Sequence, residues 1–380
     1  MLVNDLFLER FIYFCEKLIK TVLKVVHVIE ALGGGVYTYF KDLSYFFGDD
    51  EISKEIETTI IYSGKRKEID PTKIAVEFSK GVSLVEVNMV MNLSPIEDLK
   101  STIQLYKQLK KINPDIIHLH SSKAGVLGRV AAFFLLKKTK VFYSPHGYSF
   151  LRADISNANK WLFWSIEKCF QFIFRGTTIA CGDTEFEISK KIGQSLLIRN
   201  GIDIDEVRQN FKYNSNHKLT IGIVARITFA RNPKLFNDIA LQFPNYNFVW
   251  IGDGDLRDLI TAPNIAITGW LLNRHQVMEK LNNIDIYMQT SLWEGLPIAV
   301  LEAMAMEKPV IATNIIGNKD IVVHNETGFL FDNLSELDAY FKILESAVIR
   351  NDFGKKGLGR CVEVFDKDKN FSELVTVYRS

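Results

Sequence analysis

The stretch SLWEGLPIAVLEAMAMEKPVIAT (residues 291–313) carries two glutamates, Glu294 and Glu302, eight positions apart. Proline suits the first turn of a helix, and the residues after Pro297 are apolar and compatible with a helix. The free backbone N–H groups at the start of such a helix can hold an anion such as a phosphate. The β-branched run KPVIAT (308–313) that follows is typical of a buried strand. The stretch therefore predicts an α/β unit with an anion site at a helix N-terminus.

The two glutamates flank this anion site but do not suit the anion itself. A carboxylate repels a phosphate, whereas it accepts hydrogen bonds from a pair of hydroxyl groups. A ligand with a hydroxylated ring on each side of a diphosphate satisfies both glutamates and the helix N-terminus, and that ligand is a nucleotide sugar. Taken singly, Glu302 also fits an ordinary helix-surface residue and Glu294 a neighbour of a helix cap. The joint pattern with Gly295 and Pro297 favours the binding site.

An alternation of strands and helices extends along the chain. Six β-branched runs lie between KVVHVIE (24–30) and TTIAC (177–181), and four more between LTIGIVA (219–225) and KPVIAT (308–313). Buried strands that alternate with helices form βαβ units with mostly parallel sheets. The polar, turn-rich segment 200–218 separates the two sets. We therefore expect an α/β protein with two Rossmann-like domains, whose ligands bind at the carboxyl ends of strands in the cleft between the domains.

Two other strand ends carry groups suited to a diphosphate. In VARITFARNP (224–233), Arg226 and Arg231 flank the turn into a helix that starts near Pro233. Guanidinium pairs bind phosphate oxygens well, although two unrelated surface arginines are the alternative. Three glycines at 33–35 follow the first predicted strand and let backbone N–H groups approach an anion, with a plain tight turn as the alternative. Their spacing matches neither GxGxxG nor a Walker loop, which disfavours a nucleoside triphosphate.

Composition sets further bounds. The chain has 380 residues, 47% of them apolar and 24% charged, which is typical of a globular protein of about two domains. It has no run of about 18 uncharged apolar residues, so no membrane-spanning helix is predicted. Four scattered cysteines without a CxxC pair indicate free thiols in a reducing compartment, and the N-terminus lacks the basic start and cleavage site of a signal peptide. We therefore expect a cytoplasmic location.

The charge is unevenly distributed, although the net charge is only +1. Residues 100–200 contain 16 Lys and Arg against 6 Asp and Glu. Such a block suits an anionic partner, such as a membrane surface or a diphosphate-bearing lipid, and a solvated face of surface lysines is the alternative. Nucleic acid is not expected, because no recognised binding module accompanies the basic block. The aromatic-rich segment 160–175 suits contact with the inner membrane leaflet, with a packed core helix as the alternative.

Three histidines lie at or near predicted strand ends. His146 follows a strand in SPHGYSF and can reach a sugar hydroxyl or a leaving phosphate. His118 and His120 alternate on DIIHLH and so share one face of their strand. We expect His120, nearer the strand end, to reach the cleft and His118 to lie inside. No carboxylate or thiol could be placed beside the three histidines, and the D-x-D triplets at 203–205 and 253–255 are interpreted as turns, so neither a metal nor another cofactor is expected.

These motifs together resemble a known family. EGLPIAVLE (294–302) resembles the E-x7-E motif of the family 4 glycosyltransferases, a retaining family with the two-domain GT-B fold. VARITFARNP resembles the family's phosphate corner, HVIEALGGGVYTYF (27–40) its first glycine loop and LLIRNGID (196–203) its interdomain segment. HLHSSKAGVLGRVAA (118–132) and SPHGYSF (144–150) resemble members that build capsules, O-antigens and exopolysaccharides.

The resemblance implies a role for each matching residue. Glu302 would hold the ribose hydroxyls, and Glu294 the hydroxyls of the donor sugar. The residues expected to act in catalysis are Glu294, His146, Arg226 and Arg231, the two arginines on the diphosphate. Further donor contacts are expected from backbone N–H groups of Gly34, Gly35, Gly295 and Leu296, and from Trp270 in TGWLLNRHQ (268–276), which would frame the base. Where this chain has Arg231 the family usually has lysine, so the charge is kept but the geometry differs.

The chain is expected to have five parts, of which the first lies ahead of where the family usually begins, so the resemblance says nothing about it. They are an N-terminal amphipathic helical extension (1–22), an acceptor-binding domain (23–200), a linker (201–217), a nucleotide-sugar-binding domain (218–365) and a C-terminal helix (366–380) that packs back on the first domain. The extension either docks on its own domain or contacts a bilayer surface. His120, Ser122 and Lys123 of HSSKAG (120–125) are the expected acceptor contacts.

We therefore expect a retaining, metal-independent hexosyl- or N-acetylhexosaminyl-type glycosyltransferase. Its expected donor is a UDP-sugar, and its expected acceptor is a glycan linked to polyprenyl diphosphate in bacterial surface polysaccharide assembly, at the inner face of the plasma membrane. The alternative is a catalytically silent GT-B subunit that organises an active transferase. Silent relatives tend to lose a glutamate or the arginine corner, and both are intact here. A solute-binding protein would need export, which the missing signal peptide disfavours.

Overall fold

The computed structural model describes residues 22–30, 32–65, 71–90, 92–135, 138–209, 211–212 and 218–380. The helical extension expected over residues 1–22 lies outside the described residues, apart from Val22. The linker expected over 201–217 is described at 201–209 and 211–212.

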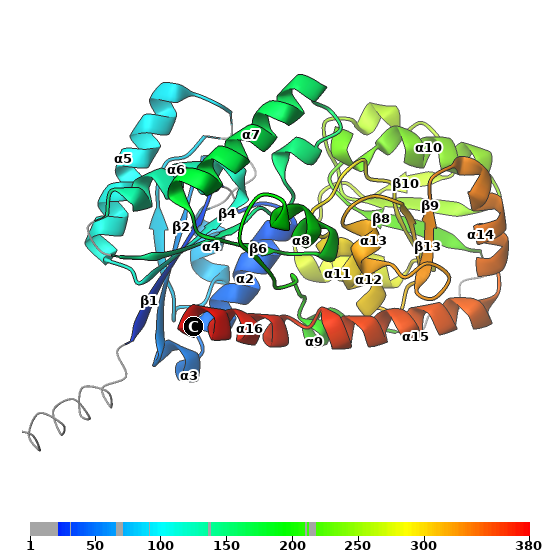
Figure 1. Ribbon diagram of the computed structural model, residues 1–380. Coiled ribbons are helices and arrows are strands. Elements are labelled where there is room, and N and C mark those ends of the chain that lie inside the picture. The colour runs from blue at the N-terminus through cyan, green and yellow to red at the C-terminus, as the bar shows by residue number, and fades with distance from the viewer. Residues whose placement is uncertain are drawn as a thin grey trace, which may run out of the picture. The chain divides into compact units, whose positions relative to one another are not determined.

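The first sheet has seven strands in the order β3-β2-β1-β4-β5-β6-β7, and the pairings β3-β2, β2-β1, β1-β4 and β6-β7 are parallel (Figure 1). Its strands are β1 (Leu23–Ile29), β2 (Ile56–Tyr62), β3 (Ser83–Glu86), β4 (Ile116–His120), β5 (Lys140–Ser144), β6 (Thr177–Ala180) and β7 (Ser195–Leu197). Every residue of β4 is buried, as expected for a parallel strand with both faces covered. The order places β1 beside β4, although β2 and β3 lie between them in the sequence.

The second sheet has six strands in the order β10-β9-β8-β11-β12-β13, and all its pairings are parallel. Its strands are β8 (Thr220–Val224), β9 (Asn247–Ile251), β10 (Ile265–Ile267), β11 (Ile286–Gln289), β12 (Val310–Thr313) and β13 (Gly328–Phe331). Counted from β8, this is the Rossmann order 3-2-1-4-5-6. Buried aromatic side chains pack in its core, where Phe236 meets both Phe248 and Trp250 edge-on. The prediction of two Rossmann-like sheets is confirmed.

Helices follow most strands. Those among the first-sheet strands are α2 (Gly35–Phe47), α3 (Asp50–Ser53), α4 (Pro71–Glu77), α5 (Pro95–Ile112), α6 (Ser121–Phe133), α7 (Asn157–Phe174) and α8 (Asp183–Lys190), with the 3-10 turn η1 (Ser149–Leu151). Later come α9 (Ile204–Arg208), α10 (Pro233–Gln242), α11 (Arg274–Asn282), α12 (Ile298–Ala305), α13 (Asn318–Ile321), α14 (Leu337–Leu344), α15 (Ala347–Val364) and α16 (Lys367–Arg379), with η2 (Phe229–Arg231), η3 (Arg257–Leu259) and η4 (Leu334–Glu336). Among the described residues, no helix is both long and apolar enough to span a bilayer.

Internal contacts divide the chain into two compact units. The first comprises Met1–Gly33 with Leu43–Phe142, and the second Gly34–Asp42 with Tyr143–Ser380. The second unit therefore includes the start of α2 and the segment from Tyr143 onward, in addition to the second sheet. The boundaries expected from the sequence, at residues 200 and 218, stay a prediction.

The predicted C-terminal helix is present as α16. The Phe371 ring packs edge-on against Tyr39 of α2, with 5.5 Å between ring centroids. At its first turn the Lys367 ammonium group pairs with the Asp203 carboxylate at 3.0 Å. Both contacts lie within the second unit.

Candidate active site

Residues expected to bind the diphosphate and the donor sugar lie at the ends of two neighbouring strands of the second sheet. Strands β8 and β11 are neighbours there, and the chain leaves them in opposite directions along the sheet order. Ligands of such sheets bind beyond the carboxyl ends of strands at this switch point. Arg226 and Arg231 follow the end of β8, and the loop with Glu294 and Gly295 follows the end of β11.

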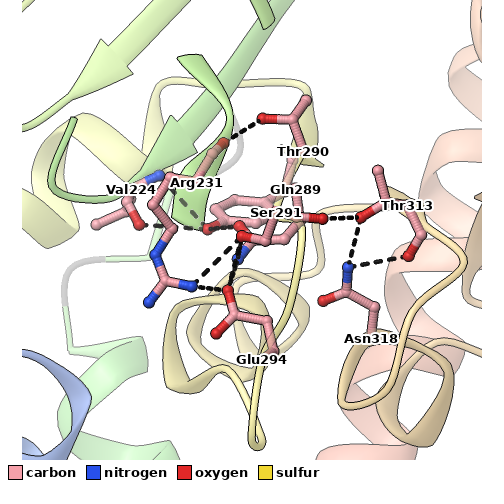
Figure 2. Close-up of polar contacts among 9 residues, drawn as sticks. Val224, Arg231, Gln289, Thr290, Ser291, Glu294, Thr313 and Asn318 are labelled. Carbon is pink, nitrogen blue, oxygen red and sulfur yellow. Dashed lines mark hydrogen bonds and ion pairs between the residues drawn. The ribbon is translucent and has the colours of Figure 1, made fainter. Parts of the chain in front are cut away.

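Glu294 is held firmly at this switch point. Its carboxylate oxygen Oε1 accepts hydrogen bonds from Gln289 Nε2 and Ser291 Oγ, each at 2.7 Å, and pairs with Arg231 Nη1 (Figure 2). The Tyr287 hydroxyl donates to Gln289 Oε1 at 3.1 Å, which turns the amide nitrogen of Gln289 toward Glu294. Glu294 is only 7% exposed. All three contacts use Oε1, so Oε2 is the oxygen of this carboxylate that remains for a ligand hydroxyl.

Arg231 is the cation of this cluster. It ends the short turn η2, its carbonyl accepts from Thr290 Oγ1 at 2.8 Å, and its Nη1 lies 3.3 Å from Ser291 Oγ. Burial and the nearby charge of Arg226 lower the pKa of Arg231 from its ordinary value. Arg226 itself is exposed. Two neighbouring like charges repel each other, and a bound diphosphate relieves that repulsion.

Gly295 lies against the backbone of another loop. A Cβ at Gly295 would come within 2.7 Å of the carbonyl carbon and oxygen of His146 and 2.9 Å of the Gly147 nitrogen. No side chain fits such a gap, because real Cβ atoms do not approach backbone atoms so closely. Glycine at 295 therefore brings His146 beside Glu294. The structure thus places two segments that the sequence singled out separately next to each other.

His146 has a left-handed backbone, with φ of 52°. Its Nδ1 lies 3.4 Å from the Asn200 side-chain amide, and its ring packs edge-on against Tyr39 at 5.2 Å between centroids. Burial lowers the pKa of His146 to about 4. The imidazole is therefore neutral at neutral pH and serves as a hydrogen-bond partner, not as a cation.

Two cavities open beside Glu294. One, of about 220 Å³, is lined by His146, Arg152, Arg231 and Trp293 among others. The second, of about 270 Å³, shares Trp293 and Glu294 with the first. Arg152 was not singled out from the sequence; its guanidinium forms a two-point contact with the Asp154 carboxylate. The sugar-sized spaces thus border the carboxylate that was predicted to bind sugar hydroxyls.

The glycine loop also approaches this site. Gly34 has a φ of +58°, which favours glycine, and Gly35 begins helix α2. A Cβ at Gly35 would lie 3.2 Å from the Ile298 side chain in the first turn of α12. The N-termini of α2 and α12 are therefore adjacent, and their expected diphosphate role stays a prediction. Leu296, the other expected N–H donor, has a buried side chain.

Glu302 and Trp270 differ in their surroundings. Glu302 is buried on α12, and its Oε1 accepts from Arg274 Nη1 at 2.7 Å. The sequence reasoning missed Arg274, although it lies within the 268–276 segment expected to frame the base. Trp270, in the same segment, is 66% exposed, so its indole ring is accessible to a ligand base.

The three expected acceptor residues belong to the first unit. His120 is fully buried, and its Nε2 lies 3.0 Å from His27 Nδ1. The Lys123 ammonium pairs with Asp98 at 2.6 Å and donates to the Asn92 carbonyl at 2.9 Å. Ser122 lies in the first turn of α6. The expected acceptor role of these residues stays a prediction, and the imidazole of His120 has no exposed surface here.

His27, His118 and His120 form a buried cluster that the sequence reasoning did not assemble. The rings of His118 and His120 lie 4.1 Å apart, as expected for two residues on one strand face. Parallel pairing of β1 with β4 puts His27 in register with His118. The ring nitrogens of the three residues lie within 4.8 Å of one another. Burial lowers the pKa of His27 to about 3, so this ring is neutral.

Comparison with known proteins identifies two family models along the chain. The model described as Glycosyltransferase Family 4 matches residues 33–206, and that described as Glycosyl transferases group 1 matches residues 205–358. A galactosyltransferase of Escherichia coli, named UDP-Gal:alpha-D-GlcNAc-diphosphoundecaprenol alpha-1,3-galactosyltransferase, is 29% identical over 76% of this chain and 81% of its own length. The capsular polysaccharide biosynthesis glycosyltransferase CapM of Staphylococcus aureus is 23% identical over 77% of this chain and 84% of its own.

Solved structures show the same fold. HepE of Anabaena, solved in complex with UDP and glucose, superposes with a TM-score of 0.71 at 15% identity, over 93% of this chain and 99% of that one. At this identity the likeness concerns the fold alone.

Proposed function

The chain belongs to the family 4 glycosyltransferases with the GT-B fold, and on this premise we propose that it moves a sugar from UDP to a glycan linked to polyprenyl diphosphate, with retention at the anomeric carbon. The E. coli relative is named for a UDP-sugar donor and a diphosphoundecaprenol-linked acceptor, and HepE binds UDP. CapM is named for capsule synthesis. These names support surface polysaccharide assembly as the setting.

The observation that carries the proposal is the Glu294 cluster at the switch point of the second sheet. One oxygen of Glu294 is fixed by Gln289, Ser291 and Arg231, and the residue borders both cavities. A carboxylate held in this way is preorganised to accept hydrogen bonds from sugar hydroxyls. In this proposal the guanidinium of Arg231 beside it binds the diphosphate together with Arg226 and the N-terminus of α12.

The proposed reaction places the charge changes on the donor. The bond between the anomeric carbon and the β-phosphate oxygen breaks, and the acceptor oxygen bonds to the same carbon on the same face. The acceptor proton passes to the leaving β-phosphate oxygen. Arg226, Arg231 and the N–H groups at the start of α12 stabilise the negative charge that develops on the diphosphate. Because these groups supply positive charge, we propose that no divalent cation is required.

His146 takes a supporting part in this proposal. Its backbone lies against Gly295, and its ring is neutral because burial lowers its pKa to about 4. A neutral imidazole can donate one hydrogen bond to a donor-sugar hydroxyl without attracting the diphosphate.

Helix α7 is proposed to contact the membrane that carries the acceptor. Trp161 is 69% exposed and Phe172 is 84% exposed. Lys168 on the same helix lies 5.3 Å over the Trp164 ring. Exposed aromatic residues beside cations are typical of helices that lie at an anionic bilayer surface.

The test is calorimetric titration of UDP, GDP and ADP, without added metal, into wild-type protein and Glu302→Ala. We expect binding selective for UDP that the substitution weakens, followed by transfer from one member of a UDP-sugar panel. Absence of binding to all three nucleotides would contradict the proposed donor site. Binding of UDP without transfer from any UDP-sugar to lipid-linked acceptors would favour a role as a silent partner instead.

A further inference from the structure

Glu302 is a buried carboxylate on α12. It is 5% exposed, and burial of a charged group is costly unless the group is paired. Within the described part of the chain, Arg274 is the one residue that forms an ion pair with it, from Nη1 to Oε1 at 2.7 Å. The second carboxylate oxygen, Oε2, is not used in that pair.

Besides Glu302, Arg274 contacts groups on two other elements, α9 and α2. Its Nε lies 3.6 Å from Glu206 Oε2 on α9, and its Nη1 lies 3.4 Å from Thr38 Oγ1 on α2. The Lys41 ammonium on α2 pairs with the same Glu206 at 3.1 Å. Arg274 Nη2 is buried without a hydrogen-bond acceptor among the described residues, so the guanidinium contacts Glu302 through Nη1 alone.

Arg274 lies at the N-terminus of helix α11. It is the first residue of α11, whose N-cap Asn273 accepts a hydrogen bond from the Gln276 backbone at 3.0 Å. It directly follows the exposed segment around Trp270 that is expected to frame the base. Burial alone would lower the pKa of Arg274, but Glu302, Glu206 and Asp42 raise it, so the side chain stays a full cation.

We propose that Arg274 is the positioning residue of the donor site: it holds Glu302 Oε1 so that Oε2 faces the ribose hydroxyls of the bound nucleotide. The inference rests on the proposed function, because it takes Glu302 as the ribose ligand. Without Arg274, the carboxylate of Glu302 loses the partner that fixes its orientation, so it accepts the ribose hydroxyls less well.

If Arg274 has this role, its substitution should change how strongly the affinity for the nucleotide depends on the 2′-hydroxyl of the ribose. A hydrogen bond to a charged group contributes about 10-fold or more in affinity. Wild-type protein should therefore bind UDP about 10-fold more tightly than 2′-deoxy-UDP, and Glu302→Ala should bind the two about equally. Arg274→Ala should weaken UDP about 10-fold and also abolish the preference for UDP, although Arg274 would not touch the nucleotide itself.

The experiment is calorimetric titration of UDP and 2′-deoxy-UDP into wild type, Glu302→Ala, Arg274→Ala and Arg274→Lys. Lysine keeps the charge but not the planar fork, so we expect an intermediate preference for UDP. The lysine variant also decides the matter if Arg274→Ala does not fold.

Arg208→Ala is the matched control. Arg208 binds the other end of α12, through the Ala305 carbonyl at 2.7 Å and the Glu307 carboxylate at 3.0 Å. Its side chain is 28% exposed, against 24% for Arg274. Its loss should lower thermal stability without changing the preference for UDP, because it contacts neither Glu294 nor Glu302.

The outcomes separate the inference from its premise. If wild type discriminates and Glu302→Ala does not, but both Arg274 variants keep the full wild-type preference, the positioning role is wrong and the donor site stands. If wild type binds neither nucleotide, or Glu302→Ala keeps the preference, the assignment of Glu302 to the ribose is wrong, and the inference is overturned with it.

Discussion

Substitution of Gly295 by alanine tests the close approach of two loops at the candidate site. The new Cβ would lie 2.7 Å from the His146 carbonyl group, whereas ordinary van der Waals contact begins at 3.4 Å. Either the loop that carries Glu294 or the segment that carries His146 must therefore move by roughly 0.7 Å to relieve the clash. A misplacement of about 1 Å at a reacting centre costs on the order of 100-fold in rate, so we expect kcat/KM to fall about 10- to 50-fold.

The same substitution should also destabilise the protein by about 1–3 kcal/mol, because the clash is with backbone and not with a flexible side chain. The assays are steady-state transfer kinetics and thermal unfolding. Gly359→Ala is the control: Gly359 is exposed on α15, and a Cβ there meets nothing within 4 Å. That control should leave kcat/KM unchanged and raise stability by about 0.5–1 kcal/mol. Wild-type kinetics and stability in Gly295→Ala would refute the close packing.

Three other predictions concern charge and surface. Burial lowers the pKa of His27 to about 3 from 6.5, so between these values the unfolded chain binds a proton at His27 that the folded chain does not. Urea unfolding should therefore show a loss of about 2 kcal/mol in the free energy of unfolding from pH 6.5 to pH 5, and a smaller loss in His27→Gln. Transfer should be unaffected by EDTA, whereas Arg226→Ala should lower kcat about 100-fold, and a change in KM alone would argue against its role. The wild type should co-sediment with anionic vesicles at low salt, and the double substitution of Trp161 and Phe172 by alanine should weaken this, whereas Val348→Ala on α15, 78% exposed, should not.

The fold was accessible from sequence because long buried strands are strongly patterned. All ten β-branched runs became strands, including β1, β8 and β11. The strands missed were β7 and β10, which have only three residues, and β13, which has four and begins with Gly328. Strand β7 ends in the first two residues of LLIRNGID (196–203), the segment that resembles an interdomain connection. Short strands of this kind are defined by pairing with a neighbour, which a local pattern does not reveal.

Part of the candidate site could also be predicted from the sequence, for a different reason. Glu294, Gly295 and Glu302 lie within nine residues, so their joint pattern is visible in one stretch. Their partners come from distant positions: Arg274 reaches Glu302, and His146 reaches Gly295, only through the fold.

The histidine cluster is a second case in which residues far apart in the sequence meet only through the fold. Alternation along β4 correctly placed His118 and His120 on one face, but their neighbour His27 is on β1. Its position beside them follows from the parallel register of β1 with β4, in which His27 pairs with His118. The burial of the His120 ring beside His27 likewise follows from the fold and not from the pattern along β4.

Both glutamates of the E-x7-E stretch pair with arginine through one carboxylate oxygen, Glu294 with Arg231 and Glu302 with Arg274. The two pairs differ in what a donor would do to them. Arg231 is expected to bind the diphosphate as well, while Gln289 and Ser291 also hold Glu294 Oε1, so Oε2 stays available for sugar hydroxyls. Arg274 is tied to Glu206 and has no expected ligand of its own, so its hold on Glu302 would persist. Sugar recognition would thus share an arginine with the diphosphate, whereas ribose recognition would use an arginine that binds no part of the donor.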